Sequence, residues 1–166
     1  DPGVKAEVTK NVLKVVGDDC IFATNTSTLP ITELAKASNA PENFIGIHFF
    51  SPVDKMMLVE IIKGEKTGER AVAKSLDYVR QIRKTPIVVN DSLGFFTSRT
   101  FGTYIDEGVR LMMEGMNPIK VDNLGKAIGM PVGPLTVHDE VSQELGRKMQ
   151  ETWKEMGVLD KWGDQS

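Results

Sequence analysis

Residues 44–62 read FIGIHFFSPVDKMMLVEII, and this stretch decides the fold. Its two ends, residues 44–50 and 56–62, are near-continuous apolar runs of strand length. Runs of this kind are typical of strands buried on both faces of a sheet, whereas a half-exposed strand would alternate apolar and polar residues. We therefore predict two buried strands within an α/β layer.

The sequence on either side extends this layer and then changes character. From Asn90 onward no further β-branched run appears, and the remaining pattern is helical, punctuated by Gly and Pro. We therefore predict an α/β domain over residues 1–89 followed by an all-α domain over residues 90–166. The predicted helices cover 4–16, 30–37, 69–84, 94–113, 118–128 and, after a bend at 131–134, residues up to about 156; the further predicted strands cover 20–24 and 86–89.

Composition excludes several classes of protein. The 166 residues include 20 Lys plus Arg against 23 Asp plus Glu, which leaves no positive excess for a nucleic-acid backbone. No apolar run approaches the roughly 20 residues needed to cross a bilayer. One cysteine and two histidines provide neither an internal disulfide nor a zinc-ligand set. We expect no nucleic-acid or membrane partner, a cytoplasmic location, and a buried, unreactive Cys20.

His48 and Glu60 are the titratable residues that call for an explanation, because each lies inside an apolar strand. A buried carboxylate without a partner costs several kcal/mol, and the nearest candidate partner in the sequence is His48. If the strands are neighbours, a contact would fix the imidazole tautomer and raise its basicity, as a general base requires. Spacing alone equally allows a structural histidine and a strand-end carboxylate that reaches solvent.

Two further segments are candidates for ligand contact. We expect the sheet to be parallel. Asn25 and Ser27 follow its strand over 20–24, at the carboxyl end, where open α/β sheets bind ligands, although the same residue types also serve as local helix caps. Gly94 precedes paired aromatic residues, where it either brings backbone near a ligand or only permits a turn. The 166 residues contain no G-x-G-x-x-G or G-x-x-x-x-G-K-[ST] phosphate loop.

Five motifs, in their order and intervals, together resemble the L-3-hydroxyacyl-CoA dehydrogenase family. They are Asn25-Thr26-Ser27, Ile47 to Pro52, Leu58 to Ile62, Val88 to Asp91 with Gly94-Phe95, and Gly129 to Pro134. The resemblance extends over nearly the whole chain and is closest to the dehydrogenase portion of multifunctional fatty-acid oxidation enzymes. It implies the C-terminal half of a Rossmann-like NAD-binding domain followed by a helical domain, in agreement with the break near residue 90.

The resemblance also implies roles for individual residues. His48 would take the proton from the 3-hydroxyl as hydride leaves C3 for NAD, and Glu60 would hold and support that base. Ser27 would hydrogen-bond the reacting oxygen, and Asn25 would lie beside the nicotinamide. Their physical task would be to orient the substrate for transfer of hydride and proton.

The chain departs from the family pattern at two substrate-binding positions. The segment Gly-Phe-x-x-Asn-Arg has Ser98 in place of Asn, and Ser51 replaces a frequent Asn beside the histidine motif. A serine hydroxyl is shorter than an asparagine amide and has fewer donors. Because His48 and Glu60 are retained, the dehydrogenase interpretation stands.

The missing cofactor loop and the first residue, Asp1, lead us to expect an internal fragment that holds catalytic side chains but, by itself, binds NAD weakly or not at all and turns over no substrate. The expected substrate is an acyl-CoA, and the expected partners are other segments or subunits of a fatty-acid oxidation complex, or a second copy in a homodimer. An alternative is a non-catalytic helical interaction module with the α/β part as its scaffold. A weaker alternative, a 3-hydroxyacid dehydrogenase acting without coenzyme A, usually uses a Lys base.

Overall fold

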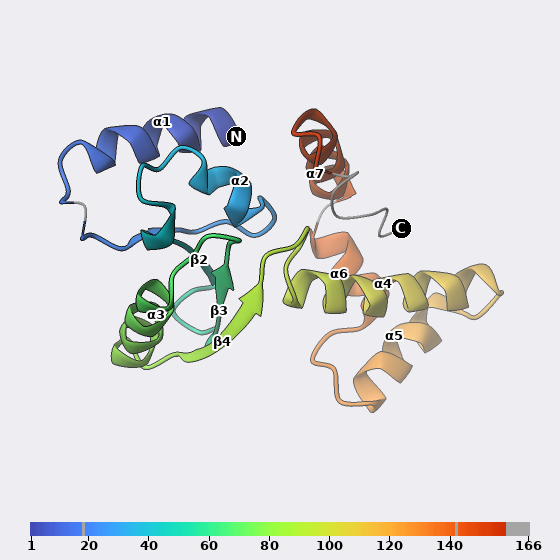
Figure 1. Cartoon of the computed structure of the whole chain (residues 1–166). Helices are drawn as coiled ribbons and strands as arrows, with labels where there is room; N and C mark the ends of the chain where they lie inside the picture. Colours follow the sequence, from blue (N-terminus) through green and yellow to red (C-terminus); the bar gives the residue numbers. More distant parts are fainter. Residues whose placement is uncertain (18, 142, 159–166) are drawn as a thin grey trace. The chain divides into compact units, whose positions relative to one another are not determined.

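The structure, a computed structural model, describes residues 1–17, 19–141 and 143–158. It divides into two compact units, Asp1–Thr97 and a second that begins at Ser98 (Figure 1). The last part of the predicted all-α domain, residues 159–166, lies outside the described residues.

The first unit is an α/β layer built on a four-stranded sheet of order β1-β2-β3-β4. β1 and β2 are parallel, β2 and β3 antiparallel, and β3 and β4 parallel. The elements of this unit are α1 (Pro2–Leu13), β1 (Phe22–Thr24), α2 (Ile31–Ala35), the 3-10 turn η1 (Pro41–Asn43), β2 (Phe44–Phe49), β3 (Leu58–Lys63), α3 (Glu69–Gln81) and β4 (Thr85–Asn90).

The expectation of a parallel sheet was therefore wrong for its central pair. Residues 50–57 connect β2 to β3. A parallel crossover needs a dozen residues or more, so this connection is too short to return the chain to the start of the sheet. The short link makes the two buried strands antiparallel neighbours.

Alternation along β2 and β3 divides their side chains between two buried faces. One face carries Ile45, Ile47, Val59 and Ile61, which form a core with buried residues of α3. The other face includes Gly46, which lies so close to Ile31 of α2 that an added Cβ would be 2.7 Å from its Cδ1. α3 and α2 thus lie on opposite sides of the sheet (Figure 1).

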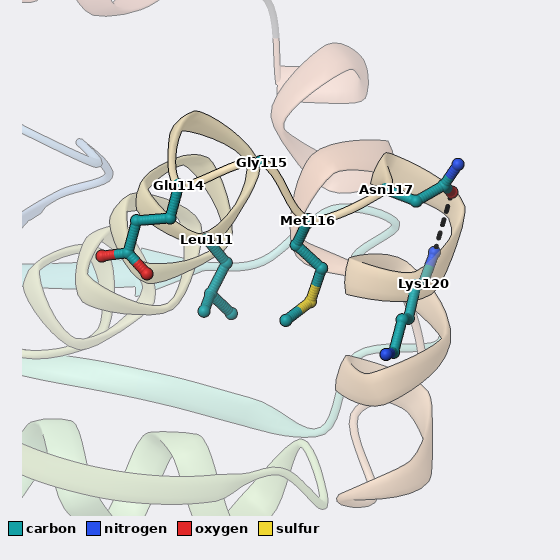
Figure 2. A pocket seen from close by; sticks show the side chains of 6 residues that line it. All are labelled: Leu111, Glu114, Gly115, Met116, Asn117 and Lys120. Carbon is teal, nitrogen blue, oxygen red and sulfur yellow. Dashed lines mark hydrogen bonds between the residues drawn. The ribbon is translucent and has the colours of Figure 1, made fainter.

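The second unit is helical in every described element. Its helices are α4 (Thr97–Met113, whose first residue ends the first unit), α5 (Pro118–Ala127), α6 (Pro134–Val141) and α7 (Gln143–Glu155). Asp122 of α5 accepts a 2.8 Å hydrogen bond from the Leu135 N–H at the start of α6, which joins the two helices. The α4–α5 connection borders an open pocket of about 460 Å³, lined by Leu111, Glu114, Gly115, Met116, Asn117 and Lys120 (Figure 2).

Cys20 is exposed, contrary to the expectation of a buried thiol. β1 begins only at Phe22, and the Cys20 N–H donates to the Gly17 carbonyl at 2.9 Å. The residue therefore belongs to the turn before the strand. Among the helices of the described residues, none is both long and apolar enough to span a membrane.

Candidate active site

His48 and Glu60 meet across the central antiparallel pair of strands. They are partners in the β2–β3 register, so their side chains leave the same face of the sheet. His48 Nδ1 lies 2.8 Å from Glu60 Oε2, and the two residues are 7% and 0% exposed. The predicted contact is confirmed, and the strand-end carboxylate that reaches solvent is excluded.

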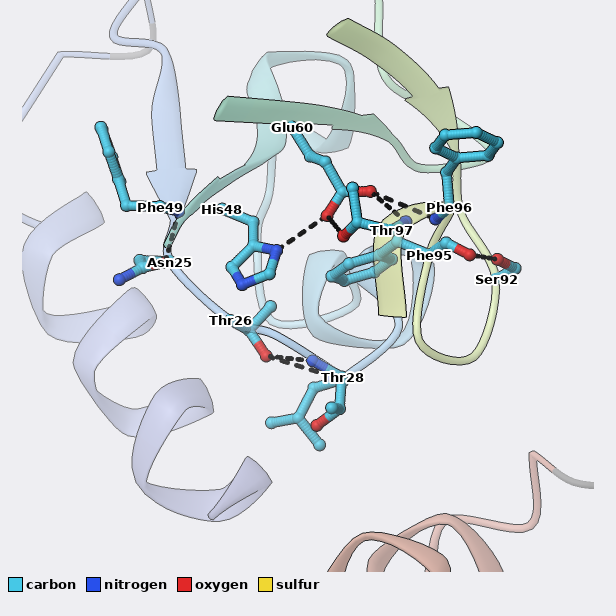
Figure 3. Close-up of polar contacts among 11 residues, drawn as sticks. Asn25, Thr26, Thr28, His48, Phe49, Glu60, Ser92, Phe95, Phe96 and Thr97 are labelled. Carbon is cyan, nitrogen blue, oxygen red and sulfur yellow. Dashed lines mark hydrogen bonds and ion pairs between the residues drawn. The ribbon is translucent and has the colours of Figure 1, made fainter. Parts of the chain in front are cut away.

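The carboxylate of Glu60 is also held by the beginning of α4 (Figure 3). Its Oε1 accepts hydrogen bonds from the N–H groups of Phe96 at 3.2 Å and Thr97 at 2.9 Å. Its Oε2, which contacts His48, also accepts from the Thr97 hydroxyl at 2.7 Å. Burial raises the pKa of Glu60, but the hydrogen bonds from His48 and Thr97 outweigh burial and lower the pKa below its ordinary 4.5.

An ionised Glu60 determines which ring nitrogen of His48 carries the hydrogen. A carboxylate can only accept, so Nδ1 is the donor and Nε2 of the neutral ring keeps its lone pair. Nε2 points away from Glu60 (Figure 3). The ring lies against Phe50 and Phe95, with centroid separations of 4.4 and 6.2 Å. The pair therefore presents a fixed proton acceptor bordered by aromatic surface.

A left-handed turn directs the backbone of residues 96 and 97 toward Glu60. Gly94 and Phe95 have φ values of 70° and 52°. Glycine adopts such angles freely, whereas a bulky residue such as Phe does so only where the surrounding structure enforces it. Phe95 is 1% exposed, so tight packing holds it there. This turn delays α4 until Thr97, three residues after the predicted start, and leaves two successive N–H groups for a carboxylate.

The loop after β1 lies beside the strand that carries His48. Asn25 is exposed, and its Oδ1 accepts from the N–H of Phe49 at 3.4 Å. Lys5 of α1 donates to the Asn25 carbonyl at 3.0 Å. Ser27 is exposed, while Thr26 accepts from the Leu29 N–H at 3.1 Å. Thr26 therefore closes a turn within the loop. The N-cap of α2 is Pro30, without a side-chain cap hydrogen bond, so neither Asn25 nor Ser27 takes the capping role that the sequence allowed.

The remaining predicted residues occupy different places. Ser51 is exposed and precedes a cis peptide bond to Pro52. Ser98 is half-buried in α4 and is the first residue of the second unit. Among the described residues, the other hydrogen bonds to the His48–Glu60 pair come from Phe96 and Thr97, and neither Ser27 nor Ser51 hydrogen-bonds to it.

Sequence reasoning missed Thr97 and Lys5. Thr97 precedes Ser98 in the segment Gly-Phe-x-x-Asn-Arg, but nothing in its spacing links it to Glu60, which is 37 residues away. Lys5 is on a helix 20 residues before Asn25, and burial lowers its pKa. Neither contact has a local pattern that could reveal it.

The described residues fit one end of a dinucleotide better than the whole. The carboxyl end of β1 leads into a loop with exposed Asn25 and Ser27, which suits a polar ring. The glycine-rich turn that grips a pyrophosphate is not among the 166 residues. Of the features of a dinucleotide site, the described residues therefore include a polar loop at a strand end and no pyrophosphate-binding turn.

Two family models together match nearly the whole chain. Residues 1–92 match the 3-hydroxyacyl-CoA dehydrogenase, NAD binding domain, and residues 94–163 match the 3-hydroxyacyl-CoA dehydrogenase, C-terminal domain. The chain is 44% identical over 152 residues to fatty acid oxidation complex subunit alpha of Shewanella amazonensis, and 44% identical to that of Shewanella loihica. These alignments cover 90% of this chain but only 21% of each relative.

Solved structures show the same likeness. (S)-3-hydroxybutyryl-CoA dehydrogenase from Ralstonia eutropha superposes with a TM-score of 0.85 at 32% identity, over 95% of this chain and 56% of that one. For 3-hydroxybutyryl-CoA dehydrogenase from Escherichia coli K12, the TM-score is 0.84 at 28% identity, over 90% of this chain and 32% of that one. The architecture is a Rossmann-like layer followed by a helical domain.

Proposed function

Because the chain belongs to the 3-hydroxyacyl-CoA dehydrogenase family, we propose that it carries the acid/base centre of an NAD-dependent enzyme that oxidises L-3-hydroxyacyl-CoA to 3-oxoacyl-CoA in fatty-acid β-oxidation. The observation that carries this proposal is the buried contact between His48 and Glu60. Since the chain spans about a fifth of the curated relatives it matches (21%), the proposed activity belongs to the longer protein.

His48 is proposed as the general base. Its Nε2 accepts the proton of the 3-hydroxyl, while Nδ1–H remains bonded to Glu60. NAD, when bound, supplies the hydride acceptor. Glu60 fixes the tautomer and offsets the positive charge that His48 gains, as an oriented carboxylate does in other histidine pairs. The lowered pKa of Glu60 keeps it an anion, so it supports the base and does not take the proton itself.

Four polar residues are proposed to position the reactants. Asn25 accepts from the N–H of Phe49, next to His48, and would lie beside the nicotinamide. Ser27 would hydrogen-bond the reacting oxygen, and Ser51 and Ser98 would contribute to binding the substrate. The proposed wider partners are other segments or subunits of a fatty-acid oxidation complex, consistent with the name of the Shewanella relatives.

The test compares the two histidines of the chain in the longer protein that contains it. His48→Gln removes the base, whereas His138→Gln changes the other histidine, which lies in α6. We expect His48→Gln to lower kcat by about 10²–10⁴-fold, the usual contribution of a general base, and His138→Gln to leave it nearly unchanged. The rate of NADH formation from a 3-hydroxyacyl-CoA measures both. Equal rates for His48→Gln and wild type would favour the non-catalytic interaction module.

A further inference from the structure

The side-chain hydroxyl of Thr97 hydrogen-bonds to Glu60 of the His48–Glu60 pair. Its Oγ1 donates to Glu60 Oε2 at 2.7 Å, and Oε2 is the same oxygen that accepts from His48 Nδ1 at 2.8 Å. Its backbone N–H donates to the other oxygen, Oε1, at 2.9 Å. One residue therefore grips both oxygens of the carboxylate and fixes its plane.

We infer that Thr97 is a positioning residue that orients Glu60 and limits how strongly Glu60 raises the basicity of His48. This inference rests on the proposed function, since it assigns His48 the role of base. The two donors on Oε2 share one negative charge, so each weakens the other's bond. Without the hydroxyl, Oε2 would give more of its charge to His48.

The surroundings of the pair make this competition effective. Glu60 is 0% exposed, so water cannot replace a lost donor without a local rearrangement. Among the described residues, the charged or titratable group in contact with Glu60 is His48, and the ring of His48 otherwise lies against Phe50 and Phe95. Asp91, the other buried carboxylate among the described residues, accepts from the N–H groups of Ile31 and Thr32.

The test removes the hydroxyl and keeps the backbone N–H. Thr97→Val and Thr97→Ala both do so, Thr97→Ser restores the hydroxyl, and Thr103→Val is the matched control. Thr103 lies in the same helix, and its hydroxyl donates to the Thr100 carbonyl at 2.7 Å. With only His48 and His138 present, nitrogen NMR of the 166-residue chain can follow the titration and tautomer of His48 directly.

We expect the NMR titration of His48 in the Val and Ala variants to move to higher pH than in wild type, because loss of the competing hydrogen bond leaves more of the Oε2 charge to His48. The Ser variant and the Thr103→Val control should titrate like wild type. In the longer protein, the acid limb of the kcat/KM profile should move to higher pH by the same amount.

An unchanged or lowered His48 pKa in a folded Val or Ala variant would overturn the inference, as would a Ser variant that fails to restore the wild-type value. If the Val variant does not fold, the Ala variant, with its higher helix propensity, decides. The NMR titration does not depend on turnover, so it tests the role of Thr97 separately from the proposed function. A longer protein without dehydrogenase activity would contradict the proposed function and leave the inference about Thr97 standing.

Discussion

His48 and Glu60 are direct register partners across β2 and β3, twelve residues apart in the chain and 2.8 Å apart at Nδ1 and Oε2. Because side chains alternate along a strand, a slip of one residue would send one of them to the opposite face. The contact therefore depends on the same register that places Ile47 and Ile61 in the core beneath α3. The register that packs the sheet therefore also brings His48 and Glu60 together.

Replacing Glu60 with Gln should separate its chemical role from a scaffold role. An amide keeps the shape but brings an NH₂ group against the Thr97 and His48 donors, and it removes the charge that supports a protonated base. We expect kcat of the longer protein to fall by about 10²–10⁴-fold, as when the orienting carboxylate of a histidine is neutralised. Glu69→Gln is the control, because Glu69 pairs with Lys63 at the surface. A rate within twofold of wild type would contradict the proposed role.

The stability of the chain should depend on pH through Glu60. Its pKa in the folded state is below the ordinary 4.5. Its contribution to the free energy of unfolding is therefore present above about pH 4.5 and is lost as the pH falls through the pKa of the folded state. Urea unfolding of wild type and Glu60→Gln, from neutral pH into the acid range, measures this. The difference in the free energy of unfolding between wild type and Glu60→Gln should narrow below pH 4.5. Asp122, whose pKa is also lowered, is present in both chains and cancels. A difference in the free energy of unfolding that stays constant across this pH range would contradict a stabilising contribution from ionised Glu60.

Gly46 should not tolerate a side chain. A Cβ there would lie 2.7 Å from Ile31 Cδ1 and 3.0 Å from Ile62 Cβ, in the buried layer between β2 and α2. We expect Gly46→Ala to lower the free energy of unfolding by about 1–3 kcal/mol, the usual cost of overpacking. Gly102→Ala in α4 is the control, because its Cβ would meet no described atom within 4 Å. That variant should gain about 0.5–1 kcal/mol from helix propensity. Equal stability of the two variants would show that α2 moves aside freely.

The 166-residue chain by itself should bind NADH more weakly than the longer protein. Asn25, which is proposed to lie beside the nicotinamide, is present, whereas no glycine-rich loop is present in these residues to bind the pyrophosphate. A fluorescence titration of NADH against both proteins gives the two dissociation constants. Comparable affinities would mean that the described residues hold the cofactor by contacts not anticipated from the sequence.

The sequence alone was enough to predict the types of most elements. It predicted a change of character near residue 90, whereas the first compact unit ends at Thr97. Near-continuous apolar runs predicted β2 and β3, and apolar spacing predicted α3, because burial and periodicity are local properties of the chain. His48 and Glu60 also stood out in the sequence, because each is a titratable residue inside an apolar strand and a buried charge requires a partner.

Only the tertiary structure decided which partners they have. The antiparallel register joins His48 to Glu60, and the left-handed turn at Gly94 and Phe95 brings Thr97 to the same carboxylate. Hydrogen bonds between residues 12 and 37 positions apart leave no periodic signal, because they depend on how separate elements pack. The sequence could therefore single out His48 and Glu60, but the hydrogen bond from Thr97 to the same carboxylate became visible only in the folded chain.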